Sequence, residues 1–561
     1  MNRRTFIKKT GGAGLLFGLG GFSIISIGCR QTYDFDLILK GGHVLDGTGK
    51  AGFNSDIGIK NKKITALGDL QNFSAYRILD VAELTVTPGF IDVHSHSADE
   101  LLVNPKAESK IRQGVTTEIL GQDGSSMAPL THEMQAEMSE RFQDRFGFGV
   151  DWLDFEGYFR RIRQTGTAVN VATMVGQGRL RECVLGMSDR AATRAEIQEM
   201  QELAHLALKQ GALGISSGLE YTPGAFASTD EIIELCKVMQ GTSGLYATHM
   251  RNEDDRVLAA VEEAIAIARG AGVGLQISHL KCQGQRNWDK LDAIFSSIAK
   301  ANSQRLMVTM DRYPYVAYST GLASLLPIWC REGGTEKFIA RLQNPALLSK
   351  IKSETLDKVS MLGSWKSVML TSVGLEKNRP LQGKTVAELV KGSGQDPFEY
   401  VRELIIEEKN RVSMVGFGMS EENTARILAH PLCMIASDGS AKAPYGPLSK
   451  SKPHPRSYGT FPRILSKYVR EENLFSLPEA IRKMTNLPAI RFGLNKRGQI
   501  AKDFMADLVI FDHDKVKDKA TFSNPHQYPE GIEYVLVNGK IVIEKEEHTR
   551  KLPGLVLTKT P

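Results

Sequence analysis

Cysteine is scarce in this chain of 561 residues, and its six cysteines are scattered. They are Cys29, Cys183, Cys236, Cys282, Cys330 and Cys433. An irregular set of this kind is not a disulfide framework, and if Cys29 is modified the remaining number is odd. We therefore expect the five later cysteines to be small apolar residues of the protein interior.

An excess of charge of one sign is also missing. The formal net charge is +6, and it falls to about +2 if Arg3, Arg4, Lys8 and Lys9 are removed with the N-terminal segment. A nearly neutral chain carries no electrostatic footprint for nucleic acid, so we expect no nucleic-acid partner. Repeats and low-complexity segments are absent too. The hydrophobic content of 42% is ordinary for a globular protein with a sizeable core.

A long, strongly apolar run is not found either. Residues 11–27 are apolar but interrupted by small residues, whereas a membrane span needs about 20 strongly apolar residues. Residues 1–29 instead predict a targeting peptide, because Arg3-Arg4 and the apolar pair after them resemble a Tat signal. Ser26-Ile27-Gly28-Cys29 resembles a lipoprotein cleavage box, so a lipid anchor through Cys29 is a further hypothesis. The alternative is an N-terminal anchor helix. We expect a location outside the cytoplasmic membrane, in the periplasm or anchored to the envelope.

Both ends of the chain predict β-strands. Residues 36–42 and 506–512 read as single strands, and residues 55–64 and 534–543 read as hairpins. Their turns fall at Asn61-Lys62 and Asn538-Gly539, and Asn-Gly is a strong hairpin signal. Residues 30–85 and 495–550 are therefore predicted to form one small β-sandwich domain from both ends of the chain.

The middle of the chain, residues 86–494, has the alternating pattern of an α/β protein. Strands alternate with amphipathic helices such as 193–209 and 256–269, which predicts a TIM-like (β/α)8 barrel. The candidate strands are 85–92, 115–120, 168–174, 214–217, 244–248, 275–278, 306–310, 411–416 and 433–436. Nine candidates exceed eight strands, so at least one belongs elsewhere. The long gap before residue 411 predicts an inserted subdomain at about 330–410.

Potential metal ligands follow several of these strands. His94 and His96 come directly after 85–92, and residues two apart on an extended chain point the same way. His249, His279 and Asp438 each follow a later strand, and barrel active sites lie at the carboxyl ends of strands. Any one of these residues alone is more often structural. Together they predict a site for zinc or a similar divalent ion.

Further segments extend this pattern into a resemblance to a known family. The run from Gly89 to His96, the later histidines and Ser437-Asp438-Gly439 resemble the amidohydrolase superfamily. Within it, the chain is most similar to the D-aminoacylase, or N-acyl-D-amino-acid deacylase, family over about residues 35–545. The supporting segments are 114–117, 217–224, 248–253, 278–281, 311–315 and 454–461.

The resemblance implies two neighbouring metal positions. His94, His96 and Asp438 would surround one, and His249 and His279 the other, which the family occupies tightly. At the second position the family uses a cysteine, whereas this chain has Asp123. A carboxylate is a competent zinc ligand, so we predict that Asp123 replaces the cysteine. The alternatives are a plain Asp123-Gly124 turn and, as a lesser ligand candidate, Glu118. The predicted cofactor is Zn²⁺, one or two ions.

The resemblance also implies a reaction, the hydrolysis of N-acyl-D-amino acids to a carboxylate and a free D-amino acid. A bound divalent ion can lower the pKa of its water from about 15.7 toward 7 and polarise the amide carbonyl. Asp438 is predicted to carry the proton to the leaving nitrogen, with a role as a pure ligand as the alternative. The small-molecule substrate carries a carboxylate, which needs a cation and hydroxyl groups. The candidates for binding it are Lys281, Tyr313, Ser319 and Arg456.

Two other functions remain open. A cyclic-amide hydrolase of the dihydroorotase or hydantoinase type often bridges its metals with a carboxylated lysine on the fourth strand. The candidate strand 214–217 contains no lysine. A non-catalytic envelope protein of the same fold is suggested only by the missing cysteine, and the retained histidines argue against it.

Overall fold

The computed structural model describes residues 32–559. The predicted targeting peptide, residues 1–29 with Cys29, lies outside the described residues. Within residues 32–559, no helix is long and apolar enough to cross a membrane. The five later cysteines are free thiols, and four of them, Cys236, Cys282, Cys330 and Cys433, are buried as expected, whereas Cys183 is half-buried.

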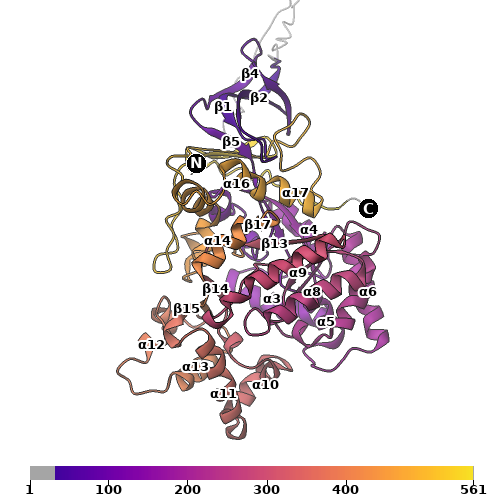
Figure 1. Ribbon diagram of the computed structural model, residues 1–561, viewed down its shortest axis with the longest axis vertical. Helices are drawn as coiled ribbons and strands as arrows, with labels where there is room; N and C mark the ends of the chain where they lie inside the picture. The colour runs from indigo at the N-terminus through magenta and orange to yellow at the C-terminus, as the bar shows by residue number, and fades with distance from the viewer. Residues whose placement is uncertain (1–31, 560–561) are drawn as a thin grey trace, which may run out of the picture.

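The two ends of the chain meet in one β domain, at the upper end of the molecule in Figure 1. Its nine strands form one hydrogen-bonded sheet in the order β21-β20-β19-β18-β5-β1-β2-β3, with β4 paired to β1. The N-terminal strands are β1 (Phe35–Val44), β2 (Phe53–Lys60), β3 (Lys63–Gly68), β4 (Ala75–Asp80) and β5 (Thr85–Pro88). The C-terminal strands are β18 (Leu508–Phe511), β19 (Ile532–Val537), β20 (Lys540–Glu544) and β21 (Glu547–His548).

The junction of the two ends lies between β5 and β18, which pair antiparallel from Thr85↔Phe511 to Pro88↔Leu508. Both predicted hairpins are present, as β2–β3 and β19–β20. Asn61, Asn538 and Gly539 have φ values of 56°, 48° and 72°, the left-handed backbone that Asn and Gly tolerate. The turn chemistry read from the sequence therefore matches the observed turns.

A parallel barrel occupies the centre of the molecule. It has eight strand positions, and the third is occupied by two short strands in succession, β8 (Asn170–Thr173) and β9 (Val175–Gly176). The other seven are β6 (Phe90–Asp92), β7 (Val115–Leu120), β10 (Gly214–Gly218), β11 (Leu245–His249), β12 (Gly274–Ile277), β13 (Val308–Arg312) and β17 (Cys433–Ile435). The ring closes where Ser95 bridges Gly439 in parallel. Leu213 N–H, just before β10, also donates a hydrogen bond to Thr173 O of β8 at 2.8 Å, which joins the third strand position to the fourth.

Helices surround the barrel. The longer ones are α3 (His132–Phe146), α4 (Phe155–Thr165), α5 (Gln177–Leu185), α6 (Arg194–Lys209), α7 (Thr229–Cys236), α8 (Val257–Ala271), α9 (Leu291–Ser303), α14 (Glu421–Ala429), α15 (Arg456–Arg463), α16 (Leu477–Met484) and α17 (Asn486–Phe492). The short helices α1 (Glu100–Val103) and α2 (Glu108–Ile111) lie between β6 and β7. The two predicted helices correspond to α6 and α8. Helix α6 begins with a capping box, because Thr193 accepts from Glu196 N–H while Glu196 accepts from Thr193 N–H.

Two strand predictions need correction. Residues 411–416 correspond to β16 (Ser413–Phe417), which is not a barrel strand but pairs antiparallel with two strands of the insertion. Residues 85–92 divide into β5, in the β domain, and β6, in the barrel. Alternating apolar residues indicate that a strand forms, but they do not identify its partner strand.

The insertion after β13 is a subdomain at the opposite end of the molecule from the β domain (Figure 1). Its sheet has the order β14-β16-β15, with β14 (Ala317–Gly321) and β15 (Val368–Ser372). Its helices are α10 (Gly334–Gln343), α11 (Pro345–Met361), α12 (Val386–Leu389) and α13 (Pro397–Glu407). These elements share an apolar core of their own. The insertion is therefore wider than the predicted 330–410, because β14 and β16 belong to its sheet.

Candidate metal centre

Six predicted metal-site residues gather at the carboxyl end of the barrel. His94 and His96 follow β6, Asp123 follows β7 and His249 ends β11. His279 follows β12, and Asp438 follows β17. In a parallel barrel these ends share one face, so residues far apart in sequence become neighbours.

Asp123 lies among all four histidines. Its Oδ1 is 3.3 Å from His94 Nε2 and 3.5 Å from His279 Nε2. Its Oδ2 is 3.5 Å from His96 Nε2 and 3.8 Å from His249 Nδ1. The two carboxylate oxygens therefore face different pairs of imidazoles, an arrangement that the single sulfur of a cysteine does not offer.

Asp438 completes the cluster on the side of His94 and His96. Its Oδ1 is 3.1 Å from His96 Nε2 and 3.6 Å from His94 Nε2. Its Oδ2 lies 2.8 Å from Nη1 of Arg456. On the other side, His249 Nδ1 and His279 Nε2 are 3.0 Å apart.

Three of these residues have a left-handed backbone. Asp123, His279 and Asp438 have φ values of 54°, 35° and 48°. A non-glycine residue in this region is uncommon, and such residues concentrate at functional sites. Gly124, with φ 73°, is required beside Asp123 because a Cβ there would lie 2.8 Å from Gly218 N. The loop that carries Asp123 is thus pressed against β10.

The donors fit a divalent cation. Imidazole nitrogens and carboxylate oxygens are suitable zinc ligands, and Asp123 Oδ1 is buried without a hydrogen-bond partner in the described part of the chain. Burial alone would raise the pKa of Asp123, but the neighbouring His94 and His279 hold it well below its usual range. Burial opposes ionisation of Asp438 as well, and Arg456 with the histidines keeps its pKa below the usual value. Both carboxylates are therefore available in the charged, ligating form.

The ligand atoms form two overlapping groups. Atoms of His94, Asp123, His279 and Asp438 lie within 4.8 Å of one another, and so do atoms of His249, Glu253 and His279. His279 is common to both groups. His96 belongs to neither group, although it lies beside Asp123 and Asp438. The family resemblance pairs Asp123 with His249 and His279, whereas here Asp123 is central to all four histidines.

Two glutamates at the centre were not identified from the sequence. Glu253 Oε1 is 3.1 Å from His279 Nδ1, and Glu220 Oε2 is 3.5 Å from His249 Nε2. Both lie in segments that supported the family resemblance, 248–253 and 217–224. Their position there was the only available signal, because each sits on a loop without a periodic pattern.

Glu118 lies behind the ligands instead of among them. It is fully buried and accepts hydrogen bonds from Ser95 and Ser97. Lys110, also fully buried, donates to Asp92 at 2.7 Å and to Ser437 at 2.6 Å. This network joins the segment that carries His94 and His96 to the segment that carries Asp438.

The metal centre opens into a cavity of about 420 Å³. Lys281, Ser319 and Arg456 line this cavity, as predicted substrate contacts should. Lys281 is 2% exposed, however, and its Nζ lies 2.6 Å from Glu253 Oε1, so that carboxylate already neutralises it. Tyr313 is not among the lining residues. It is fully buried, and the Arg456 guanidinium lies 4.7 Å from its ring centroid.

Two further spaces adjoin this cavity. A polar groove of about 930 Å³ shares His96, Ser319, Asp438 and Arg456 with it. A smaller chamber of about 290 Å³ shares Glu220, Ser324 and Lys358 with it. The metal centre therefore lies between a wide groove on the Asp438 side and a narrow chamber on the His249 side.

Solved structures of other proteins share the fold of this chain. The solved structure of a D-aminoacylase matches with a TM-score of 0.79 at 37% identity, covering 94% of this chain and all of that one. An N-acyl-D-glutamate deacylase from Bordetella bronchiseptica, solved with zinc and a phosphonate inhibitor, matches with a TM-score of 0.79 at 32% identity, over 94% and 100% of the two chains. An L-hydantoinase from Arthrobacter aurescens matches at 16% identity with a TM-score of 0.54, which shows a shared fold alone.

Sequence comparison is equally extensive. An amidohydrolase family model matches residues 367–543. A D-aminoacylase from Alcaligenes xylosoxydans xylosoxydans is 38% identical over 94% of this chain and 98% of its own length. An N-acyl-D-glutamate deacylase from the same organism is 33% identical over 93% and 96% of the two chains. The chain therefore belongs to the amidohydrolase family, in the group of D-aminoacylases and N-acyl-D-amino-acid deacylases.

Proposed function

We propose that this protein hydrolyses the amide bond of N-acyl-D-amino acids, giving a carboxylate and a free D-amino acid. The observation that carries the proposal is the cluster of four histidines with Asp123 and Asp438, in a chain that matches deacylases over nearly its whole length. No lysine lies on β10, so the lysine bridge of cyclic-amide hydrolases has no counterpart there.

The proposed cofactor is zinc, held by His94, His96, Asp123, His249, His279 and Asp438. When bound, a divalent ion supplies a water molecule of lowered pKa and polarises the substrate carbonyl. Because Asp123 directs one oxygen toward His94 and His279 and the other toward His96 and His249, it can serve two neighbouring ions. One solved D-aminoacylase is described as having a binuclear metal centre.

The proposed proton carrier is Asp438. An amide nitrogen leaves only after protonation, so a group near the scissile bond must deliver a proton to it. Asp438 lines the cavity, and its lowered pKa keeps the side chain in the ionised form that a proton acceptor needs, while making it a weaker base. Arg456 holds Oδ2 at 2.8 Å, which leaves Oδ1 beside His96 to exchange the proton.

Arg456 is the proposed contact for the substrate α-carboxylate. Its guanidinium lines both the cavity and the polar groove, and it lies over the ring of Tyr313. A guanidinium carries five N–H donors, so its contact with Asp438 leaves donors for a second carboxylate. Lys281 instead contacts Glu253 at 2.6 Å and His279 Nδ1 at 2.7 Å in this arrangement.

We further propose that residues 1–29 direct export through the Tat route, to the periplasm or the envelope. The twin arginine Arg3-Arg4 supports this proposal. Tat export of an already folded, metal-loaded enzyme suits a site whose ligands come from five separate segments. A lipid anchor at Cys29 belongs to the same proposal.

A substrate screen tests the proposed activity. Purified, zinc-loaded protein would be assayed for release of free amino acid from paired N-acetyl-D- and N-acetyl-L-amino acids, with dihydropyrimidine and hydantoin rings alongside. Release from the D-series alone is the expected result. Turnover confined to the cyclic amides, or no turnover by a fully metal-loaded protein, would overturn the proposal.

A further inference from the structure

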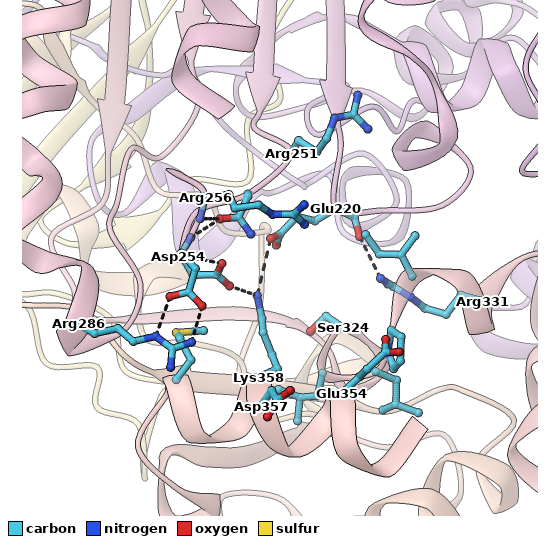
Figure 2. A pocket seen from close by; sticks show the side chains of 17 residues that line it. Glu220, Arg251, Asp254, Arg256, Arg286, Ser324, Arg331, Glu354, Asp357 and Lys358 are labelled. Atoms are coloured by element: carbon cyan, nitrogen blue, oxygen red, sulfur yellow. Dashed lines mark hydrogen bonds and ion pairs between the residues drawn. The ribbon is translucent and has the colours of Figure 1, made fainter. Parts of the chain in front are cut away.

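The chamber on the His249 side, here called the insertion chamber, lies between barrel loops and the inserted subdomain (Figure 2). Its barrel side includes Glu220, Arg251 and Asp254, and its insertion side includes Arg331 and Lys358. Apolar side chains line part of it: Leu325, Leu326, Pro327, Ile328 and Met361. It therefore offers both an apolar wall and charged groups to a ligand.

Most cations of the insertion chamber are already paired. Lys358 Nζ lies 2.6 Å from Asp254 and 3.7 Å from Glu220. Arg251 pairs with Glu263 at 2.9 Å, and Arg286 pairs with Asp255. Arg256 is exposed at the rim.

Arg331 differs from these cations. Within residues 32–559 no carboxylate oxygen lies within 4.0 Å of its guanidinium, and its Nε is buried without a hydrogen-bond partner. Its one hydrogen bond goes from Nη2 to the backbone carbonyl of Glu220 at 3.3 Å, as Figure 2 shows. Burial lowers the pKa of this guanidinium, because the nearby Cys330 and Glu220 only partly offset its desolvation. Arg331 is half-buried, and its unpaired donors make an anion a favourable partner for it.

The position of Arg331 relates it to the metal centre through one residue. Glu220 contacts His249 with its carboxylate at 3.5 Å and Arg331 with its carbonyl at 3.3 Å. With the substrate α-carboxylate at Arg456, on the Asp438 side, the acyl group would extend toward His249 and Glu220, the side on which the cavity meets the insertion chamber. The chamber that a short acyl chain would enter on this side has an apolar wall and Arg331 among its lining residues.

We propose that Arg331 binds a carboxylate at the far end of the substrate's acyl group, so that the preferred substrates are D-amino acids acylated by a dicarboxylic acid. The inference rests on the proposed function and adds the class of acyl group to it. The reaction is simple hydrolysis: water adds across the amide bond, the dicarboxylic acid leaves with two free carboxylates, and the D-amino acid regains its amino group.

The test compares acyl groups that differ only in charge. N-glutaryl and N-succinyl derivatives of one D-amino acid would be compared with the corresponding monoamides, in which a neutral amide replaces the far carboxylate. We expect kcat/KM to favour the carboxylates by about 10- to 100-fold, the range for a charge-assisted hydrogen bond. Arg331→Gln should reduce this ratio to near one, and Arg331→Lys should retain part of it. Because the ratio is taken within each enzyme, a general loss of activity cancels.

The matched control is Arg286→Gln, which removes a paired, exposed cation from the same chamber and should leave the ratio as in the wild type. A wild-type ratio near one, or a ratio unaffected by Arg331→Gln, would overturn the proposal. A preference for N-acetyl-D-glutamate over N-acetyl-D-glutamine that disappears in Arg331→Gln would also overturn it, since Arg331 would then bind the amino-acid side chain.

If no N-acyl-D-amino acid is hydrolysed, the proposed function fails separately. Calorimetric binding of free glutarate, present in the wild type and lost in Arg331→Gln, would still detect the subsite.

Discussion

The carboxylate of Glu253 lies 3.1 Å from Nδ1 of His279, while Nε2 of the same ring faces the metal cluster. An imidazole that ligates a metal through one nitrogen usually donates its other N–H to a carboxylate, which fixes the tautomer and the ring orientation. Lys281 Nζ lies 2.6 Å from the same Glu253 oxygen, where it keeps the carboxylate charged, and 2.7 Å from His279 Nδ1. Against the cost of burial, Lys281 and the histidines lower the pKa of Glu253. Glu253 is therefore a positioning residue for His279.

Glu253→Gln tests this role. The amide keeps the size of the side chain but can present its NH₂ group to His279, which removes the restraint on the tautomer. Loss of such a partner typically lowers metal affinity by about 10- to 100-fold. Zinc affinity measured by competition with a chelator is the readout. Glu202→Gln, on an exposed position of α6, is the control and should bind zinc as the wild type does. Unchanged affinity in Glu253→Gln would show that packing alone orients the ring.

Asp123→Asn tests the residue that stands at the family's cysteine position. Asparagine tolerates the left-handed backbone at φ 54° but is a much poorer metal ligand than a carboxylate. We expect bound zinc and activity to fall together, as measured by elemental analysis and turnover of the same sample. Asp123→Cys should restore part of the zinc, because a thiolate is also a zinc ligand. A folded Asp123→Asn protein with full zinc content would show that Asp123-Gly124 is only a turn.

The sequence could predict those parts of the site that follow directly from strand ends. His94, His249 and Asp438 lie at or just past the ends of apolar strands, and parallel strands bring their carboxyl ends together. The partner of β16 could not be predicted, because the same alternation serves a barrel strand and an antiparallel strand of the insertion. The role of Lys281 depends on Glu253, which lies on another loop. Tyr313 faces the underside of Arg456, a contact that becomes visible only in three dimensions.

Zinc uptake should depend on pH. In the metal-free protein Asp123 and Asp438 outweigh the effect of burial and raise the pKa of His96 to about 9. A histidine must lose its proton to ligate a metal, so protons compete with zinc below that pH. We expect the zinc affinity of protein stripped with a chelator to rise with pH to about 9 and beyond, because Glu253, Asp123 and Asp438, against burial and Lys281, also raise the pKa of the ligand His279. Titration calorimetry in buffers of different ionisation heat should also detect proton release at pH 7. An affinity independent of pH between 6 and 9 would contradict this protonation state.

Export should depend on the twin arginine. Arg3→Lys together with Arg4→Lys keeps the charge of the segment but removes the guanidinium pair of the Tat signal. We expect the variant to remain in the cytoplasm, as measured by fractionation and immunoblotting, while its zinc content stays that of the exported protein. Cys29→Ala is a separate variant, which should release an exported protein from the envelope if Cys29 carries a lipid. Normal export of the double lysine variant would exclude the Tat route.

Asp438→Asn separates proton transfer from ligation. The substitution keeps the size of the side chain and the polar contacts to Arg456 and His96, but an amide cannot accept the proton from water. General acid–base catalysis contributes about 10²–10⁴-fold, so kcat should fall by at least that range if Asp438 is the carrier. Zinc analysis of the same sample shows whether ligation is also lost, since Asp438 lies 3.1 Å from His96 and 3.6 Å from His94. Retained zinc with a greatly reduced kcat assigns the proton transfer to Asp438. Loss of zinc with a kcat per bound zinc near that of the wild type identifies Asp438 as a ligand only. Another group would then carry the proton, and the candidate is Glu220, the nearest carboxylate to His249.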